Sequence, residues 1–267
     1  MSENDHEFAR AKLTRDFRVL GRRDDGYHAI RSEMVTLELR DDLEFSAGDG
    51  LEIVDAIDWS GRRPGDVLSS IVPGANLVTR ALELVGRKAH IRLTKRIPPG
   101  AGLGGGSADA AAVLRWAGIA GLDRAALLGA DVPFCVRGGR ALVQGIGDVL
   151  EPLPIVDASF VLVVPAIAVS TAAVYRAFDE FGSEKEPDAS NDLEKAALVV
   201  EPRLAQYRDQ LKAVTSRRPQ LAGSGATWFV ECGHSEAIRV AEELRASVAD
   251  AGVSAVVVAT KSAANSQ

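Results

Sequence analysis

The stretch PPGAGLGGGSADAAAVLR, residues 98–115, is the most informative part of the chain. Its first half has glycine at positions 100, 102, 104, 105 and 106, and its second half is rich in alanine, which favours helix. The apolar alternation of AHIRLTKRI, residues 89–97, predicts a strand directly before it. We expect Ser107 to be the helix N-cap. A strand, a glycine loop and a helix N-terminus together favour binding of an anion, because unhindered backbone N–H groups can converge there.

Three familiar glycine motifs do not describe this loop. A Walker A loop needs a lysine followed by serine or threonine, and GGGSAD has no lysine. Gly100, Gly102 and Gly105 match the G-x-G-x-x-G pattern of dinucleotide sites, but two prolines separate them from the strand, so this match is weak. No serine here or in GSG, residues 223–225, has glycine two positions away on both sides, as a nucleophile elbow requires. A phosphate-binding loop remains, with a plain glycine turn as the alternative.

Composition limits the class of protein. The chain has 267 residues, of which 46% are hydrophobic and 25% charged, as expected of a soluble protein with one large domain or two lobes. We find no apolar run long enough for a membrane helix and no basic, apolar leader, so we expect a cytoplasmic protein without membrane partners. A net charge of −6 argues against nucleic-acid binding. Cys135 and Cys232 are too few for a disulfide framework and lack zinc-site spacing.

Periodicity predicts a strand-rich first half. Alternating apolar residues indicate strands over 12–20, 32–41 and 42–47, with a turn at RRDDGYH, residues 22–28. The segment 75–86 is predicted to be a helix that Asn76 caps and Gly86 ends. The turn GIGDVLEPLP, residues 145–154, is expected to close a first lobe near residue 155.

The second half alternates strands and helices, which predicts a small α+β sandwich. We expect a helix over 170–182 with Ser170 or Thr171 as its cap, and one strand running through QLAGSGATWFVEC, residues 220–232. The polar segment 182–192 is expected to be mobile, and residues 261–267 to be a disordered tail.

The glycine loop resembles the phosphate-binding motif of the GHMP kinases. Three more stretches resemble one family among them, the 4-diphosphocytidyl-2-C-methyl-D-erythritol kinases: residues 11–28 with RRDDGYH, 128–153 with GADVPF, and GSGATWF at 223–229. This resemblance implies a two-lobe α+β fold, with a ribosomal protein S5 domain 2-like N-terminal lobe at 1–155 and a ferredoxin-like α/β-plait lobe at 156–260.

The implied reaction transfers the γ-phosphoryl group of ATP, with Mg²⁺, to the 2-hydroxyl of the cytidine diphosphate methylerythritol substrate. Asp131 matches the family's catalytic aspartate, which accepts the proton of the attacking hydroxyl. Lys12 matches a lysine that stabilises developing charge. Without the resemblance, Asp131 would be a cap residue before Pro133, and Lys12 a solvated edge charge.

The resemblance also implies which residues bind the two substrates. The ATP-binding set is Asn76, Pro98, Gly100, Ala101, Gly102, Leu103, Gly104, Gly105, Gly106 and Ser107, and the Ser107 hydroxyl is also a candidate Mg²⁺ ligand. The set for the second substrate is Thr14, Tyr27, His28, Thr171, Tyr175, Gly223 and Ser224. Tyr27 and Tyr175 would stack on the two faces of the cytosine, and His28 would hydrogen-bond to it.

One stretch departs from the family pattern. Thr14 stands where the family commonly has asparagine, and Arg15 and Asp16 stand where apolar residues are usual. Two alternatives therefore stay open: another GHMP kinase that acts on homoserine or a sugar, and a non-catalytic nucleotide-binding relative. The sequence also leaves open whether the chain is a monomer or a homodimer.

Overall fold

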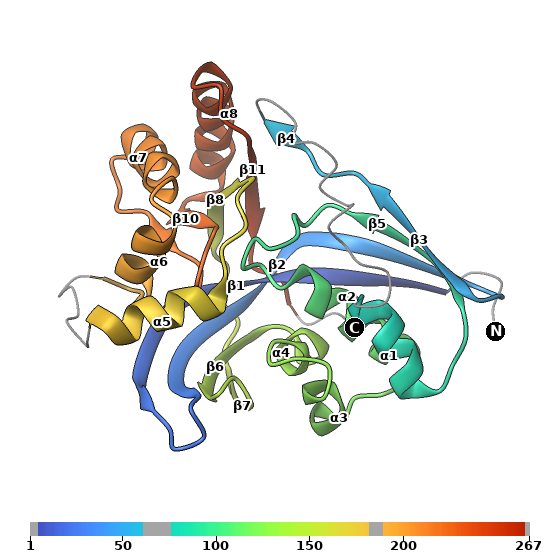
Figure 1. Cartoon of the computed structure of the whole chain (residues 1–267). Coiled ribbons are helices and arrows are strands. Elements are labelled where there is room, and N and C mark those ends of the chain that lie inside the picture. The colour runs from blue at the N-terminus through green and yellow to red at the C-terminus, as the bar shows by residue number, and fades with distance from the viewer. Residues whose placement is uncertain (1–4, 61–75, 182–188, 265–267) are drawn as a thin grey trace.

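A long hairpin at the start of the chain crosses the molecule (Figure 1). In the computed structural model, which describes residues 5–60, 76–181 and 189–264, β1 (Asp5–Arg22) and β2 (His28–Ser46) pair antiparallel from end to end. The sequence predicted shorter, separate strands here. Register shifts, such as the one between Thr14 and Asp16, let the pair bend without ending.

The first sheet is built on this hairpin. Its order is β3-β5-β2-β6-β7, and β1 pairs with the other edge of β2. The remaining strands are β3 (Gly50–Asp55), β5 (His90–Lys95), β6 (Arg140–Gly145) and β7 (Val149–Leu153), and β7 lies within the predicted turn 145–154. The helices of this lobe are α1 (Leu77–Val85), α2 (Gly105–Trp116), α3 (Leu122–Ala126) and α4 (Val132–Arg137). α2 packs against β1, α1 and α4, and this packing fixes the position of the glycine loop at its N-terminus.

The second sheet is antiparallel and has the order β4-β11-β8-β10-β9. Its strands are β4 (Trp59–Ser60), β8 (Ser159–Pro165), β9 (Gln220–Leu221), β10 (Trp228–Cys232) and β11 (Ala255–Lys261). The helices of this lobe are α5 (Thr171–Phe181), α6 (Glu194–Val200), α7 (Leu204–Thr215) and α8 (His234–Asp250). The order β11-β8-β10-β9 is that of a ferredoxin-like plait. The single strand predicted over 220–232 is wrong, because the GSG turn divides it into β9 and β10.

An apolar cluster joins the two sheets. It includes Leu13 and Leu37 of the hairpin, Leu103 of the glycine loop, and Phe160 and Phe229 of the second sheet, and each of these side chains is buried. The two-lobe α+β fold is therefore confirmed. The boundary at residue 155 stays a prediction, and β4, which precedes it, pairs with β11 in the second sheet.

The prediction that residues 261–267 form a disordered tail is wrong for the first of these residues. Lys261 ends β11, the Ser262 N–H donates to the Ala158 carbonyl at 2.8 Å, and the Ala263 N–H donates to the Thr36 carbonyl at 2.8 Å. Residues 265–267 lie outside the described residues. These bonds tie the end of β11 to the first sheet.

The expected mobile segment 182–192 is wrong for its last residues, while 182–188 lie outside the described residues. The Phe17 N–H donates to the Ser190 carbonyl and the Asp192 N–H to the Phe17 carbonyl, both at 2.9 Å. Cys135 and Cys232 are free thiols. Among the described helices, none has the length and apolar character needed to cross a bilayer.

Candidate functional site

The glycine loop enters α2 earlier than predicted. Gly104, in a left-handed conformation with φ 69°, is the N-cap, and the helix begins at Gly105. The prediction of Ser107 as the cap is therefore wrong, and Ser107 lies in the first turn. A Cβ at position 104 would lie 2.8 Å from Lys12 Cγ, so only glycine lets the chain turn into the helix this close to β1.

Both lobes hold the loop in place. The Lys12 N–H donates to the Leu103 carbonyl at 2.9 Å, and the Thr227 hydroxyl donates to the Ala101 carbonyl at 2.6 Å. A Cβ at Gly102 would lie 2.5 Å from the Gly225 carbonyl oxygen, so the two glycine turns touch backbone to backbone. The loop is thus fixed against the hairpin and the second lobe, which is the pre-organisation that a phosphate-binding loop needs.

A cavity of about 400 Å³ lies beside the loop. Among the predicted ATP-binding residues, Asn76, Pro98, 100–102 and 104–107 line it, whereas Leu103 is buried in the cluster between the sheets. The Asn76 side chain also accepts from the Val78 N–H at 2.9 Å, so the predicted N-cap of α1 is confirmed.

Sequence reasoning missed a buried charge cluster at the edge of this cavity. The Lys95 ammonium donates to Asp41 Oδ2 at 2.5 Å and to Asp109 Oδ2 at 2.6 Å, and all three side chains are buried. Asp41 Oδ1 accepts from the backbone N–H groups of Arg96 and Ile97. The alternation of AHIRLTKRI could have predicted that Lys95 is buried, because Lys95 lies on the same face of the strand as the buried Ile91 and Leu93.

Burial shifts the pKa values of this cluster. Desolvation raises the pKa of Asp109 to about 7, and the nearby Asp41 charge adds to this while Lys95 opposes it. Desolvation alone would lower the pKa of Lys95, but the two carboxylates outweigh it and raise that pKa. The charge on Lys95 is therefore matched inside the protein.

A second cavity, of about 360 Å³, lies on the other side of the loop. Of the residues predicted for catalysis and for the second substrate, seven line it, namely Lys12, Thr14, Asp131, Thr171, Tyr175, Gly223 and Ser224. Gly102 and Ser107 line both cavities, so the two spaces adjoin there.

Lys12 and Asp131 form an ion pair in this second cavity. Lys12 Nζ lies 3.3 Å from Asp131 Oδ2 and 3.4 Å from the Thr14 hydroxyl, and Lys12 is only 6% exposed. Asp131 is the N-cap of α4 by position, yet its side chain makes no capping hydrogen bond, and 33% of it is exposed. The carboxylate faces the lysine and the cavity, as a proton acceptor would.

The second lobe closes this cavity with the GSG turn. The hydroxyls of Thr171 and Ser224 lie 2.8 Å apart. The Asn191 side-chain amide, which sequence reasoning missed, donates to the carbonyls of Leu221 and Gly223 at 2.8 and 2.7 Å. Asn191 is itself buried, so these two hydrogen bonds hold the GSG turn in a fixed position.

Of the three residues predicted to bind the cytosine, only two lie in contact. Tyr175 stacks on the His28 ring, with centroids 4.7 Å apart and an interplanar angle of 23°. Burial raises the pKa of the Tyr175 hydroxyl to about 12. Tyr27 is 64% exposed, and neither Tyr27 nor His28 lines either cavity. The structure thus brings Tyr175 and His28 together but leaves Tyr27 apart from them.

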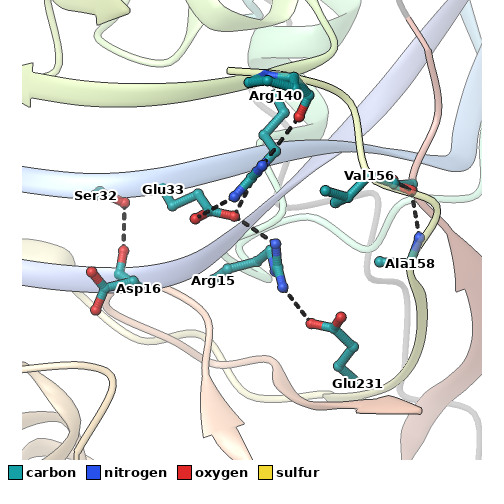
Figure 2. Close-up of polar contacts among 10 residues, drawn as sticks. Arg15, Asp16, Ser32, Glu33, Arg140, Val156, Ala158 and Glu231 are labelled. Carbon is teal, nitrogen blue, oxygen red and sulfur yellow. Dashed lines mark hydrogen bonds and ion pairs between the residues drawn. The ribbon is translucent and has the colours of Figure 1, made fainter. Parts of the chain in front are cut away.

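The residues that depart from the family pattern link the lobes (Figure 2). Arg15 donates to Glu33 of β2 at 2.6 Å and to Glu231 of β10 at 2.5 Å. Arg140 of β6 donates to both oxygens of Glu33, at 2.9 and 3.0 Å. The Asp16 carbonyl accepts from the Ser32 hydroxyl, and the Asp16 carboxylate lies 3.2 Å from Arg18 Nε and 3.5 Å from Arg31 Nη1. The charges in this stretch therefore have structural partners outside the cavities.

Comparisons with known proteins agree with this geometry. Residues 76–139 match the family model for the GHMP kinases N terminal domain. A 4-diphosphocytidyl-2-C-methyl-D-erythritol kinase of Ruegeria pomeroyi is 38% identical over 251 residues, covering 83% of this chain and 86% of that protein. The kinase of the same name from Pelotomaculum thermopropionicum is 38% identical over 260 residues, with the same coverage.

Solved structures agree as well. A 4-(cytidine 5'-diphospho)-2C-methyl-D-erythritol kinase is similar with a TM-score of 0.74 and 32% identity, over 97% of this chain and 100% of that one. A homoserine kinase from Cytophaga hutchinsonii has a TM-score of 0.62 at 18% identity, covering 100% of this chain and 97% of its own, and shows the fold alone. On the strength of the relatives with high coverage, the chain belongs to the 4-diphosphocytidyl-2-C-methyl-D-erythritol kinase family of GHMP kinases.

Proposed function

We propose that this chain transfers the γ-phosphoryl group of ATP to the 2-hydroxyl of 4-diphosphocytidyl-2-C-methyl-D-erythritol, a step of the non-mevalonate isoprenoid route, in the cytoplasm. The observation that carries the proposal is the Lys12–Asp131 pair, with 3.3 Å between charged atoms, beside the two residues that line both cavities. The identity of the substrate is inferred from the names of the relatives, and each of the two cavities offers space for one reactant.

Each part of the chain has one task in this proposal. The backbone N–H groups of the glycine loop bind the ATP phosphates at the positive end of α2. Asp131 accepts the proton of the attacking hydroxyl. Lys12, which pairs with the Asp131 carboxylate, stabilises the negative charge that develops on the transferred group.

Mg²⁺ would accompany the triphosphate. The described residues contain no cluster of three or more His, Cys, Asp or Glu side chains that could hold a metal ion alone. Ser107, which lines both cavities, would hold the ion through its hydroxyl oxygen, a ligand type that suits Mg²⁺. When bound, the ion neutralises phosphate charge.

The second cavity would hold the methylerythritol end. Thr14, Thr171, Gly223 and Ser224 line it and offer hydroxyl and backbone groups to a polyol. The cytidine end would lie at Tyr175, with His28 beside it and Tyr27 as the second stacking ring. Because Tyr27 is exposed, we propose that it reaches the base only in the complex.

A coupled ATPase assay tests the proposal. The purified chain is given ATP and Mg²⁺ with the cytidylyl methylerythritol substrate, homoserine or mevalonate in parallel. We expect ADP release with the first alone. Turnover with homoserine or mevalonate would support another GHMP kinase, and ATP binding without turnover of any acceptor would support a non-catalytic relative. His28→Ala and Tyr27→Ala should weaken binding of the cytidylyl substrate and leave ATP binding unchanged.

A further inference from the structure

Asp179 makes a contact that the proposed reaction does not explain. Its Oδ1 atom lies 2.7 Å from His28 Nε2, and the His28 side chain is 10% exposed. The contact crosses from α5 in the second lobe to the start of β2 in the first. Asp179 therefore reaches the one histidine that the proposed function assigns to the base of the substrate.

Helix geometry lets α5 hold the His28 ring on several sides. Tyr175 and Asp179 are four residues apart, so they lie on one face of α5. Tyr175 stacks on the ring, Phe178 meets it edge-on with centroids 6.3 Å apart, and Asp179 binds its Nε2 edge. The ring therefore has one orientation relative to Tyr175, and its second nitrogen, Nδ1, has a fixed direction.

The partner also fixes which nitrogen carries the proton. An ionised carboxylate only accepts hydrogen bonds, so Nε2 must be the donor in this contact. A neutral imidazole has one N–H, so Nδ1 is then an acceptor. Among the described residues no hydrogen bond reaches Nδ1.

An acceptor at this place distinguishes the two common pyrimidines. Cytosine carries an exocyclic amino group, a donor, where uracil carries a carbonyl oxygen, an acceptor. An acceptor facing that position pairs with cytosine and leaves uracil with two unpaired acceptors, which is costly in a desolvated site.

We propose that Asp179 is a positioning residue that holds His28 with Nδ1 as an acceptor, and thereby selects a cytosine over a uracil diphosphate. This inference rests on the proposed function, since it places the base of the substrate beside His28. A tether between the hairpin tip and α5 would explain the contact without any effect on base preference, so base preference is the property to measure.

The experiment measures binding of CDP and of UDP by calorimetry, and kcat and KM with the cytidylyl and uridylyl methylerythritol substrates. Asp179→Asn keeps the shape but can donate to Nε2 as well as accept, which permits either tautomer. We expect its cytosine-to-uracil preference to fall about tenfold, through KM and the dissociation constant rather than kcat. Glu180→Gln, which removes the adjacent exposed carboxylate of α5, is the matched control and should keep the preference.

The outcomes separate the inference from the proposed function. Equal losses of affinity for CDP and UDP, or an unchanged preference in Asp179→Asn, would mean a tether only and overturn the inference. No turnover of either substrate by the unmodified chain would overturn the proposed function, while the CDP and UDP binding still decides the inference. If Asp179→Asn does not fold, nitrogen-15 NMR of the unmodified chain decides: a neutral His28 protonated at Nδ1 would overturn it.

Discussion

Two buried lysines border the two cavities, and their surroundings differ. Lys12 and Lys95 are 6% and 4% exposed, and both belong to strands of the first sheet. Lys95 contacts two buried carboxylates, at 2.5 and 2.6 Å, whereas Lys12 contacts one partly exposed carboxylate at 3.3 Å and the Thr14 hydroxyl at 3.4 Å. Burial of a lysine therefore does not by itself indicate what the lysine does.

The two lysines differ in how completely neighbouring carboxylates neutralise their charge. The charge of Lys95 is neutralised within the protein, so it adds little attraction for a ligand but is needed to compensate Asp41 and Asp109. Lys12 pairs with one partly exposed carboxylate and lines a cavity, so its charge can respond to a developing oxyanion. We infer that Lys95 maintains the fold beside the loop and that Lys12 acts on the reactants.

The largest effect is expected at the partner of Lys12. Asp131→Asn removes the proton acceptor while keeping the side-chain volume, so kcat should fall about 10³-fold or more. ATP affinity should change little, whereas the thermal unfolding midpoint should fall, because the buried Lys12 ammonium loses its Asp131 partner. Steady-state kinetics, with calorimetry for ATP, measure both. Near-normal turnover would refute its assignment as the base.

Next in size is the loss of Lys95. Lys95→Met leaves Asp41 and Asp109 buried without a counter-charge, so the free energy of unfolding should fall by about 3–5 kcal/mol. Urea unfolding at neutral pH measures it. Lys88→Met, on an exposed lysine whose partner Asp49 is also exposed, is the control and should cost far less. Equal effects in the two variants would contradict the structural role of Lys95.

Lys12→Met should reduce turnover strongly and stability only slightly, which is the reverse of the effect expected for Lys95→Met. Asp131 stays partly hydrated without its partner, so stability should change less than in Lys95→Met, while kcat should fall about 100-fold. Kinetics and urea unfolding on the same preparation separate the two effects. A variant that loses stability but keeps its turnover would contradict the inference that Lys12 acts on the reactants.

The smallest effect is a pH dependence of stability. Because the pKa of Asp109 is raised from 3.8 to about 7, the folded chain retains a proton that the unfolded chain releases. The free energy of unfolding should therefore fall as the pH rises from about 4 to about 7. Asp109→Asn lacks this proton, so it should lose about 2 kcal/mol less than the unmodified chain between pH 5 and pH 8. Parallel slopes in urea unfolding would show that Asp109 does not titrate there.

Local signals were enough to predict some of these features. The Asn76 cap and the Gly86 end of α1 follow from side chains that act on their own helix, and both are confirmed. The glycine loop was predicted to bind phosphate from its own residues, whereas Lys12 and Asp131 were identified by resemblance. The structure places Lys12 and Asp131 together, although their roles stay predictions.

Features that depend on distant residues were not predictable in this way. The start of α2 at Gly105 follows from the approach of Lys12 to Gly104, two residues far apart in the chain. Arg15 could not be paired with Glu231 from the sequence, because 216 positions separate them. Lys95 and Lys12 are both lysines on strands, and only their partners distinguish them.

The hairpin of β1 and β2 has a consequence for biosynthesis and for protein engineering. Phe17, Val19 and Ile30 of the hairpin belong to the apolar core of the second lobe, and β4 completes the second sheet. A ribosome that has made the first 155 residues has therefore made strand edges and apolar side chains whose partners are still missing. A gene cut at that position would encode two fragments with incomplete cores, each of which depends on the other to fold.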